Sequence, residues 1–240
     1  MNRPYIISFA NSKGGVGKTT LCMAFANFLV AKEMNVQIVD CDDQRSIQKK
    51  RESELEIARD NESPLKIPYK IFGYRFSNAE KTQDLLKVLC NNNIFSLLDM
   101  PGSENQKGME ELIISSDIIV IPFIYEFMVL GATAEFVMNI ISYIKEHKKK
   151  VRCRLVFVPN CFNPSTGTKE EKEKFDSITA SLSKFGVVTA PIHIRQDMKR
   201  FSTISDLDRQ NEIVNASFEE ILKIIESNHE EEEQQGKEQG

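Results

Sequence analysis

A short run rich in glycine, lysine and threonine near the start of the chain is the segment best suited to chemistry. Residues 11–20 read Asn-Ser-Lys-Gly-Gly-Val-Gly-Lys-Thr-Thr. Three glycines allow the backbone to curve into a nest whose N–H groups point inward. A helix beginning at about Lys18 would turn its positive end toward the same nest. Such a turn suits polyphosphate, with Lys18 reaching the outer phosphates and the Thr19 hydroxyl ligating Mg²⁺.

Carboxylates follow two other apolar segments. Residues 36–41 are short and apolar and lead into Asp40-Cys41-Asp42-Asp43-Gln44, and residues 96–99 read Ser-Leu-Leu-Asp before Met-Pro-Gly. A buried strand that ends in a carboxylate is what a magnesium site at the edge of a sheet needs. The following glycine, Gly102, gives the next loop freedom to move in the manner of a nucleotide switch.

Strand-like and helix-like segments alternate almost to the end of the chain and would position these residues. The predicted strands are 5–10, 36–41, 69–72, 94–99, 117–122, 151–159 and 187–192. The predicted helices are 19–32, 46–60, 78–90, 109–115, 127–145, 170–184, about 196–206 and 211–227. This alternation predicts an α/β fold, a parallel twisted sheet with helices on both faces. Ligands bind at the carboxyl ends of such strands, where the glycine-rich loop, Asp40, Asp42 and Asp99 would converge.

Length and composition fit one domain, residues 1–228, followed by an acidic disordered tail, residues 229–240. The net charge of -4 is misleading, because six acids and one lysine lie from Glu226 onward and leave 29 acids and 30 bases in the rest. No apolar run approaches the ~20 residues of a membrane helix, and no signal peptide opens the chain. Five scattered cysteines without a C-x-x-C spacing favour reduced thiols, with Cys22, Cys90 and Cys153 in the core.

The loop departs from the ordinary P-loop, G-x-x-x-x-G-K-[ST], because Asn11 or Ser12 stands in place of the first glycine and Lys13 is added. The run K-G-G-V-G-K-T-T resembles the deviant Walker A box of the ParA/MinD family of ATPases. This resemblance implies the P-loop architecture, ATP and Mg²⁺ as cofactors, and a homodimer in which Lys13 crosses to the partner's nucleotide. It assigns ATP binding to Gly14, Gly15, Val16, Gly17, Lys18, Thr19 and Thr20.

Residues 40–46 are similar to the second family motif, D-x-D-P-Q-x-S. The resemblance implies that Asp42 orients the attacking water and that Asp40 lies near the magnesium shell. With Lys13 and Lys18, Asp42 forms the expected catalytic set, and Thr19, Asp99 and Asp40 form the expected metal set. Asp43 replaces the usual proline, which adds negative charge and leaves the fine positioning of this turn open.

Three further segments extend the resemblance over most of the chain. Residues 121–130 are similar to the I-P-x-x-x-E-[FY]-x-x-L segment of the ParA branch, which contributes to the dimer interface. Asn160, after a predicted strand, matches an adenine-contacting position, and Pro191 lies where the family has its second adenine-side loop. We expect both to contact adenine.

Small ParA proteins bind DNA non-specifically as ATP-bound dimers, chiefly through basic residues toward the C-terminal region. Arg195, Lys199 and Arg200 are therefore the DNA-binding candidates, since cation clusters bind phosphate backbones without reading sequence. The run Lys148–Lys150 is more typical of a solvated helix end. The resemblance implies a cytoplasmic, nucleoid-associated ATPase that segregates a plasmid, chromosome or mobile element, stimulated by a ParB-like or other partner.

Two alternatives use the same nucleotide motifs. A nucleoid-riding ATPase could position a protein cargo, and a MinD-type ATPase would bind membrane through a basic amphipathic C-terminal helix. We expect no membrane partner, because here residues 218–225 precede an acidic stretch that anionic lipid would repel. The iron–sulfur reductase branch is excluded, because no cysteine lies between Asp99 and Arg152.

Overall fold

The computed structural model describes residues 4–60, 67–91, 93–102, 106–146, 153–165, 167–205 and 208–238. Within these ranges, seven strands form one sheet in the order β3-β2-β4-β1-β5-β6-β7, and neighbouring strands are paired in parallel. The strands are β1 (Tyr5–Phe9), β2 (Val36–Asp40), β3 (Lys70–Gly73), β4 (Phe95–Asp99), β5 (Ile118–Phe123), β6 (Arg154–Pro159) and β7 (Val187–Val188). The predicted α/β fold with a parallel sheet is confirmed.

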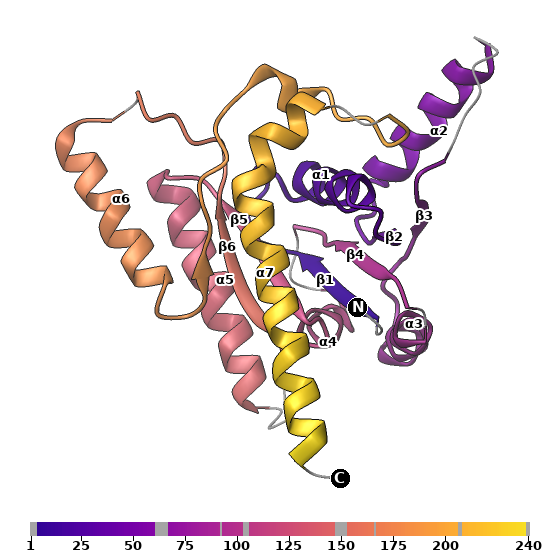
Figure 1. Cartoon of the computed structure of the whole chain (residues 1–240). Coiled ribbons are helices and arrows are strands. Elements are labelled where there is room, and N and C mark those ends of the chain that lie inside the picture. The colour runs from indigo at the N-terminus through magenta and orange to yellow at the C-terminus, as the bar shows by residue number, and fades with distance from the viewer. Residues whose placement is uncertain are drawn as a thin grey trace.

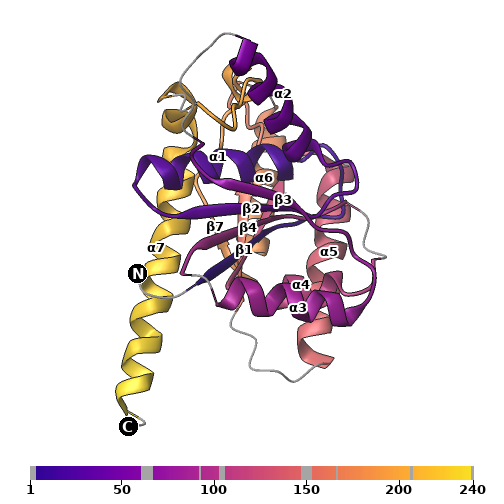
Figure 2. The same cartoon turned by 90° about the vertical axis from the view of Figure 1, so that its right-hand side faces the viewer.

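Helices cover both faces of the sheet (Figures 1 and 2). On one face the apolar cluster joins the sheet to α1 (Lys18–Ala31), α2 (Ser46–Asp60) and α7 (Asp208–Glu238). On the other it joins the sheet to α3 (Ala79–Cys90), α4 (Met109–Ile114), α5 (Phe127–Glu146) and α6 (Lys169–Leu182). Helices on both sides explain why the central strands are buried along their whole length and read as continuous apolar runs.

An aromatic cluster fixes α7 against α1. The Phe218 ring meets Phe25 edge-on at a centroid distance of 5.0 Å and Phe28 at 5.6 Å. Phe25 also contacts Phe9 of β1, with 6.0 Å between centroids. Because α1 begins at the phosphate-binding loop, this packing holds that helix rigidly behind the loop.

The C-terminal third differs from the prediction. Residues 196–206 were expected to be helical, but only Gln196–Lys199 form a short 3-10 helix, η1, and α7 begins at Asp208. The strand predicted over residues 187–192 shortens to Val187–Val188, since this is an edge strand and Pro191 has no N–H to donate. α7 extends to Glu238, because Glu, Gln and Lys favour helix, and the disordered tail expected from residue 229 stays a prediction.

Two smaller expectations also change. By length and composition alone, Met128–Glu146 of α5 could cross a membrane, with 19 residues and mean hydropathy 1.2. In the fold, Phe136, Val137 and Ile140 of that helix pack on the sheet, and 28% of the apolar stretch is buried. Of the three cysteines predicted for the core, Cys22 is buried and Cys153 half-buried, but Cys90 is exposed, and all are free thiols.

Candidate functional site

Three neighbouring strands end side by side and bring the candidate residues together. Asp99, the last residue of β4, is in register with Phe9 of β1 and with Asp40 of β2. The glycine-rich loop follows β1 directly, and α1 begins at Lys18. Three segments far apart in sequence therefore meet at the carboxyl end of the sheet.

Two glycines give the loop its shape. Gly15 has φ 78° and Gly17 has φ 101°, in the left-handed region that side chains rarely adopt. A Cβ on Gly17 would also lie 2.2 Å from Nδ2 of Asn160. Gly17 is the N-cap of α1, and no side chain caps that helix. The N–H groups of its first turn are thus available to an anion.

Asn11 holds the loop from behind. This residue is 1% exposed, and its Nδ2 donates to the carbonyl of Pro122 (2.8 Å) and to the hydroxyl of Thr133 (2.9 Å). Its Oδ1 accepts the backbone N–H of Lys13 at 3.1 Å. Sequence reasoning treated Asn11 only as a missing glycine and did not consider Thr133. A buried asparagine satisfied from β5 and α5 fixes where the loop begins.

Asn160 supports the other side of the loop. Its Nδ2 donates to the carbonyl of Val16 at 2.8 Å, and the residue is 6% exposed. Pro191 instead lies at a cavity of about 450 Å³ whose lining includes Tyr125, Phe162 and Phe175. The structure therefore places one adenine candidate under the phosphate loop and the other on an aromatic cavity.

Thr19 and Asp99 form the pair best suited to a divalent cation. The Thr19 hydroxyl donates to Asp99 Oδ2 at 2.8 Å. The other oxygen, Asp99 Oδ1, is buried and has no hydrogen-bond partner among the described residues. Burial raises the pKa of Asp99 to about 7, and the negative charge of Asp40 adds to the rise. A buried, under-coordinated carboxylate beside a hydroxyl fits Mg²⁺, which prefers hard oxygen ligands.

Asp40 and Asp42 have different environments. Oδ2 of Asp40 accepts the N–H groups of Ile47 (3.1 Å) and Gln48 (3.2 Å) in the first turn of α2, which favours an anion. Burial raises the pKa of Asp40, and its Oδ1 is buried with no partner among the described residues. Asp42 is half-exposed, and its Oδ1 accepts the N–H of Gln44 at 2.8 Å. Asp40 thus anchors α2, while the charge of Asp42 acts on Lys18 of the loop, where it opposes the lowering of the pKa by burial.

The residue that departs from the family motif, Asp43, points to solvent. It pairs with Arg75 at 3.2 Å, and both side chains are more than half exposed. An ion pair of this kind contributes little to stability. The replacement therefore adds a surface charge without altering the buried contacts of Asp40.

The two lysines of the loop, Lys13 and Lys18, also differ in the environment of their side chains. Lys18 is 9% exposed, and its ammonium donates to the carbonyl of Lys13 at 3.2 Å. Burial lowers the pKa of Lys18, and the nearby Asp99 and Asp42 oppose that effect. The backbone of Lys13 is fixed through its N–H and its carbonyl. Among the described residues, none forms an ion pair or hydrogen bond with its ammonium.

A family model agrees with this geometry. The model of the CobQ/CobB/MinD/ParA nucleotide binding domain matches residues 7–237, almost the whole chain. The chain belongs to this family. It is therefore a nucleotide-binding protein, and the family resemblance read from the loop is confirmed. No curated protein matches the chain.

Solved structures share the fold of this chain at low sequence identity. A putative plasmid partition protein from Borrelia burgdorferi bound to AMPPNP is 20% identical, with 94% of this chain and 99% of that chain covered and a TM-score of 0.65. The ParA of pNOB8 bound to nonspecific DNA is 15% identical (95% and 99%, TM-score 0.60). The MinD cell division protein of Aquifex aeolicus is 15% identical (91% and 97%, TM-score 0.64). At these identities the likeness shows the fold alone.

The basic candidates of this family member lie on the surface beyond β7. Arg195 precedes η1, Lys199 ends it and Arg200 follows it, and all three side chains are exposed. The second basic run, Lys148–Lys150, lies outside the described residues. Arg195, Lys199 and Arg200 are therefore three exposed cations within six residues of the chain, which we call the basic segment (residues 195–200).

Proposed function

We propose that this chain is a Mg²⁺-dependent ATPase of the ParA type that dimerises around ATP, binds DNA without sequence preference and acts in DNA partition. The observation that carries the proposal is Lys13. Its backbone belongs to the phosphate loop, yet its ammonium has no partner among the described residues. A P-loop that works alone does not need this second lysine, so we assign the ammonium to the nucleotide of a second copy.

Each subunit would contribute its own residues to the reaction. The loop N–H groups and Lys18 would hold the phosphates and offset the charge that develops on the transferred group. Thr19 and Asp99 would hold Mg²⁺, which neutralises phosphate charge when bound, and Asp40 would stand behind them. Asp42, the more exposed carboxylate, would orient the attacking water.

Nucleotide binding by the solved relatives supports the proposal in part. The partition protein from Borrelia burgdorferi was crystallised with AMPPNP, and the pNOB8 ParA with nonspecific DNA. For this chain we assign adenine to the side of the loop where Asn160 and Pro191 lie, and DNA to the basic segment. A ParB-like or other partner would stimulate hydrolysis and release the DNA, and the ATPase would then be nucleoid-associated in the cytoplasm. The same ATPase cycle could position a protein cargo instead of DNA.

A membrane-positioning role of the MinD type fits the C-terminal helix less well. The apolar face of α7 packs within the domain, since its residues Val214, Phe218, Ile221 and Ile225 are buried against the sheet and α1. A membrane-binding helix needs an unpartnered apolar face. Sedimentation with anionic liposomes and ATP separates the two roles: pelleting without DNA affinity would favour the membrane role.

Affinity for a DNA duplex of mixed sequence tests the proposal. It should be measured with ADP and with a non-hydrolysable ATP analogue over a series of salt concentrations. We expect binding with the analogue only, with an affinity that falls steeply with salt. Alanine at Arg195, Lys199 and Arg200 should weaken DNA binding. It should also reduce the slope of log binding constant against log salt concentration by about 0.9 for each DNA phosphate that the variant no longer neutralises.

A matched control removes three exposed lysines from the opposite face, Lys81, Lys87 and Lys107. That variant loses the same net charge, so an equal loss of DNA affinity in both variants would contradict the assignment of the basic segment. Wild-type DNA affinity that is the same with ADP and with the analogue would contradict the proposed function.

A further inference from the structure

A buried arginine joins α2 to the segment that follows the basic segment. Arg51 of α2 is 7% exposed. Its Nε donates to Thr203 Oγ1 (2.8 Å), and its two terminal nitrogens donate to the carbonyls of Thr203 (2.7 Å) and Tyr69 (2.9 Å). The guanidinium also lies over the Tyr69 ring, 4.9 Å from its centroid. One side chain thus joins three segments.

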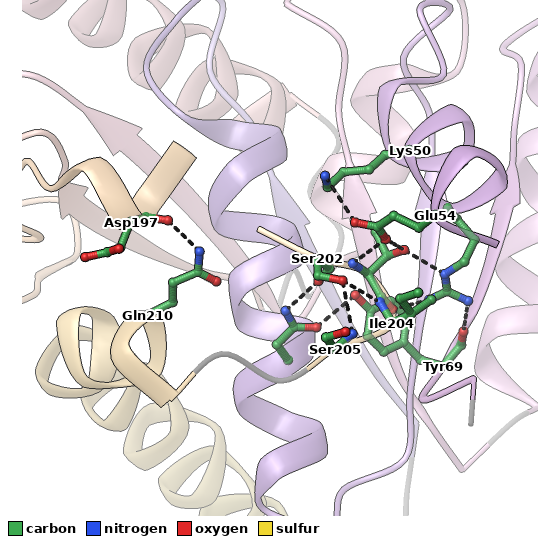
Figure 3. A network of polar contacts seen from close by, with 11 residues as sticks. Lys50, Glu54, Tyr69, Asp197, Ser202, Ile204, Ser205 and Gln210 are labelled. Carbon is green, nitrogen blue, oxygen red and sulfur yellow. Dashed lines mark hydrogen bonds and ion pairs between the residues drawn. The ribbon is translucent and has the colours of Figure 1, made fainter. Parts of the chain in front are cut away.

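Glu54, three residues further along α2, holds the same partner. Its Oε2 accepts the N–H of Thr203 (2.8 Å) and the Thr203 hydroxyl (2.5 Å), and its Oε1 pairs with Lys50 at 3.1 Å. Figure 3 shows Glu54, Lys50 and Tyr69 gathered around this point, with Ser202, Ile204 and Ser205 beside them. Thr203 is fully buried, and every polar atom of its backbone and side chain is bonded to α2. We call Arg51, Glu54 and Thr203 the clamp.

Helix α1 also contacts this segment, through Asn27. Asn27 donates from Nδ2 to the carbonyl of Ser202 at 2.9 Å, and its Oδ1 accepts the Tyr69 hydroxyl at 3.0 Å. The Ser202 hydroxyl in turn accepts the N–H groups of Ile204 (3.2 Å) and Ser205 (3.0 Å). Residues 202–205 are therefore shaped by contacts from two helices rather than by a secondary structure of their own.

Both helices begin at the nucleotide site. α1 starts at Lys18, and the first turn of α2 is bonded to Asp40. Ile47, Arg51 and Glu54 are spaced at i, i+4 and i+7, so they share one face of α2. At a rise of about 1.5 Å per residue, the clamp lies about 10 Å along the helix from the Asp40 contact. A displacement at Asp40 would therefore reach Thr203 through about two turns of helix.

The other end of the clamped segment is the basic segment. Arg200 lies three residues before Thr203, and the Gln210 side chain donates to the carbonyl of Asp197, which ties η1 to α7 (Figure 3). A shift of α2 and α1 against the sheet would move residues 202–205 and, through them, the exposed cations.

The buried charge makes this connection stiff. The Arg51 donors are satisfied only while Thr203 and Tyr69 stay in place, and an unsatisfied buried cation is costly. Partial separation of α2 from residues 202–205 would leave that cation without acceptors. Helix α2 and residues 202–205 therefore move together or separate completely. An element with two such discrete arrangements can transmit a change between distant sites.

We propose that Arg51, Glu54 and Thr203 are positioning residues that couple the nucleotide state at Asp40 to the placement of the basic segment. This inference rests on the proposed function for its output, DNA binding, but the coupling itself is a property of the clamp. Among the described residues, the hydrogen bonds of these three side chains run to one another, to Lys50 and to Tyr69, so we infer that they act through α2 and not on the nucleotide.

Thr203→Val tests the proposal with the smallest change. Valine keeps the shape of the buried side chain but removes the hydroxyl that Arg51 and Glu54 share. The measured quantity is the ratio of DNA affinity with a non-hydrolysable ATP analogue to that with ADP, which for coupled sites is about 5- to 150-fold. We expect this ratio to fall to less than half its wild-type value in Thr203→Val, with analogue affinity in the absence of DNA unchanged.

Thr203→Ser is the rescue variant, because serine restores the hydroxyl and should restore the ratio. Lys49→Met is the matched control, since Lys49 is an exposed cation on the same helix. Arg51→Met removes the buried cation outright and should lower the ratio further. If Arg51→Met does not fold, Thr203→Val and Thr203→Ser still test the coupling, because valine keeps the side-chain shape without the hydroxyl and serine keeps the hydroxyl without the methyl group.

Amide hydrogen exchange gives a readout that does not need DNA. The N–H groups of residues 203–205 are bonded to Glu54 and Ser202. We expect the ATP analogue to change their exchange rates in the wild type and in Thr203→Ser but not in Thr203→Val.

These results separate the two claims. If exchange responds as expected while no DNA binding occurs, the proposed function fails and the coupling stands. If DNA binds, an unchanged DNA-affinity ratio in Thr203→Val overturns the coupling. Amide exchange at residues 203–205 that does not respond to the nucleotide in the wild type overturns the coupling whether or not DNA binds.

Discussion

Replacing Asp99 by asparagine should stabilise the nucleotide-free protein, and by an amount that grows with pH. In the folded chain this carboxyl is about 1% exposed, and burial raises its pKa from 3.8 to about 7. An acid whose folded pKa is raised binds its proton more tightly when folded, so stability falls as pH rises from about 4 to about 7. Asparagine carries no charge and keeps an oxygen for the Thr19 hydroxyl.

The two pKa values set the size of the effect. Each pKa unit corresponds to about 1.4 kcal/mol. Relative to its value well below pH 4, the free energy of unfolding falls by about 2 kcal/mol at pH 5, where the carboxyl ionises only in the unfolded chain, and by about 4 kcal/mol at pH 8, where it ionises in both states. The stability gap between Asp99→Asn and wild type should therefore widen by about 2 kcal/mol between these two pH values.

Urea unfolding of both proteins at pH 5 and pH 8, without nucleotide or Mg²⁺, measures this gap. Asp84→Asn is the control, because Asp84 lies on the surface of α3 in an exposed pair with Lys87. Its gap should stay near zero at both pH values. A gap between Asp99→Asn and wild type that does not change with pH would refute the claim that Asp99 is a buried, under-coordinated carboxylate suited to a divalent cation.

Three further substitutions test the loop, the water-orienting residue and the packing of α7. Gly17→Ala should lower the free energy of unfolding by about 1–3 kcal/mol and abolish nucleotide binding, because alanine is strained at φ 101° and its Cβ would meet Asn160. Its control is Gly14→Ala, which has open space around the added Cβ and should unfold at nearly the wild-type urea concentration. Asp42→Ala should slow ATP hydrolysis by about 100-fold or more while equilibrium nucleotide binding is retained, and wild-type turnover would exclude its role. Phe218→Ala should lower the free energy of unfolding by about 3–5 kcal/mol, and a loss below about 1 kcal/mol would mean that α7 is not docked as described.

Local sequence signals predicted the parts of the fold that local interactions determine. Gly15 and Gly17 have the positive φ angles that the loop needs. The apolar runs before Asp40 and Asp99 form buried strands that end side by side. Seven parallel strands and their crossover helices followed from the alternation of apolar periodicities. These features repeat within a few residues, so the sequence shows them directly.

Contacts between distant segments left no comparable signal. Asn11 meets Thr133 across 122 positions, and Arg51 meets Thr203 across 152. Nothing near Asn11 in the chain indicates which carbonyl it will find. The misplaced helix over residues 196–206 has the same cause, since residues 202–205 take their shape from Asn27, Arg51 and Glu54 and not from their own propensity.

The C-terminal end of α7 extends beyond the part that packs on the domain. An acidic stretch poor in apolar residues predicts a disordered tail from residue 229, which stays a prediction, and the helix that packs on α1 through Phe218 continues to Glu238. A helix already nucleated by packing extends at little cost through good helix formers.

The central claim is that one chain's phosphate site is completed by Lys13 of a second chain. Light scattering of wild type and Lys13→Ala, each with Mg²⁺ and a non-hydrolysable ATP analogue, tests it most directly. We expect the wild type to double its mass with the analogue but not with ADP, and Lys13→Ala to bind the analogue and stay monomeric. A wild type that remains monomeric with bound analogue, or a Lys13→Ala variant that dimerises and hydrolyses ATP like the wild type, would contradict it.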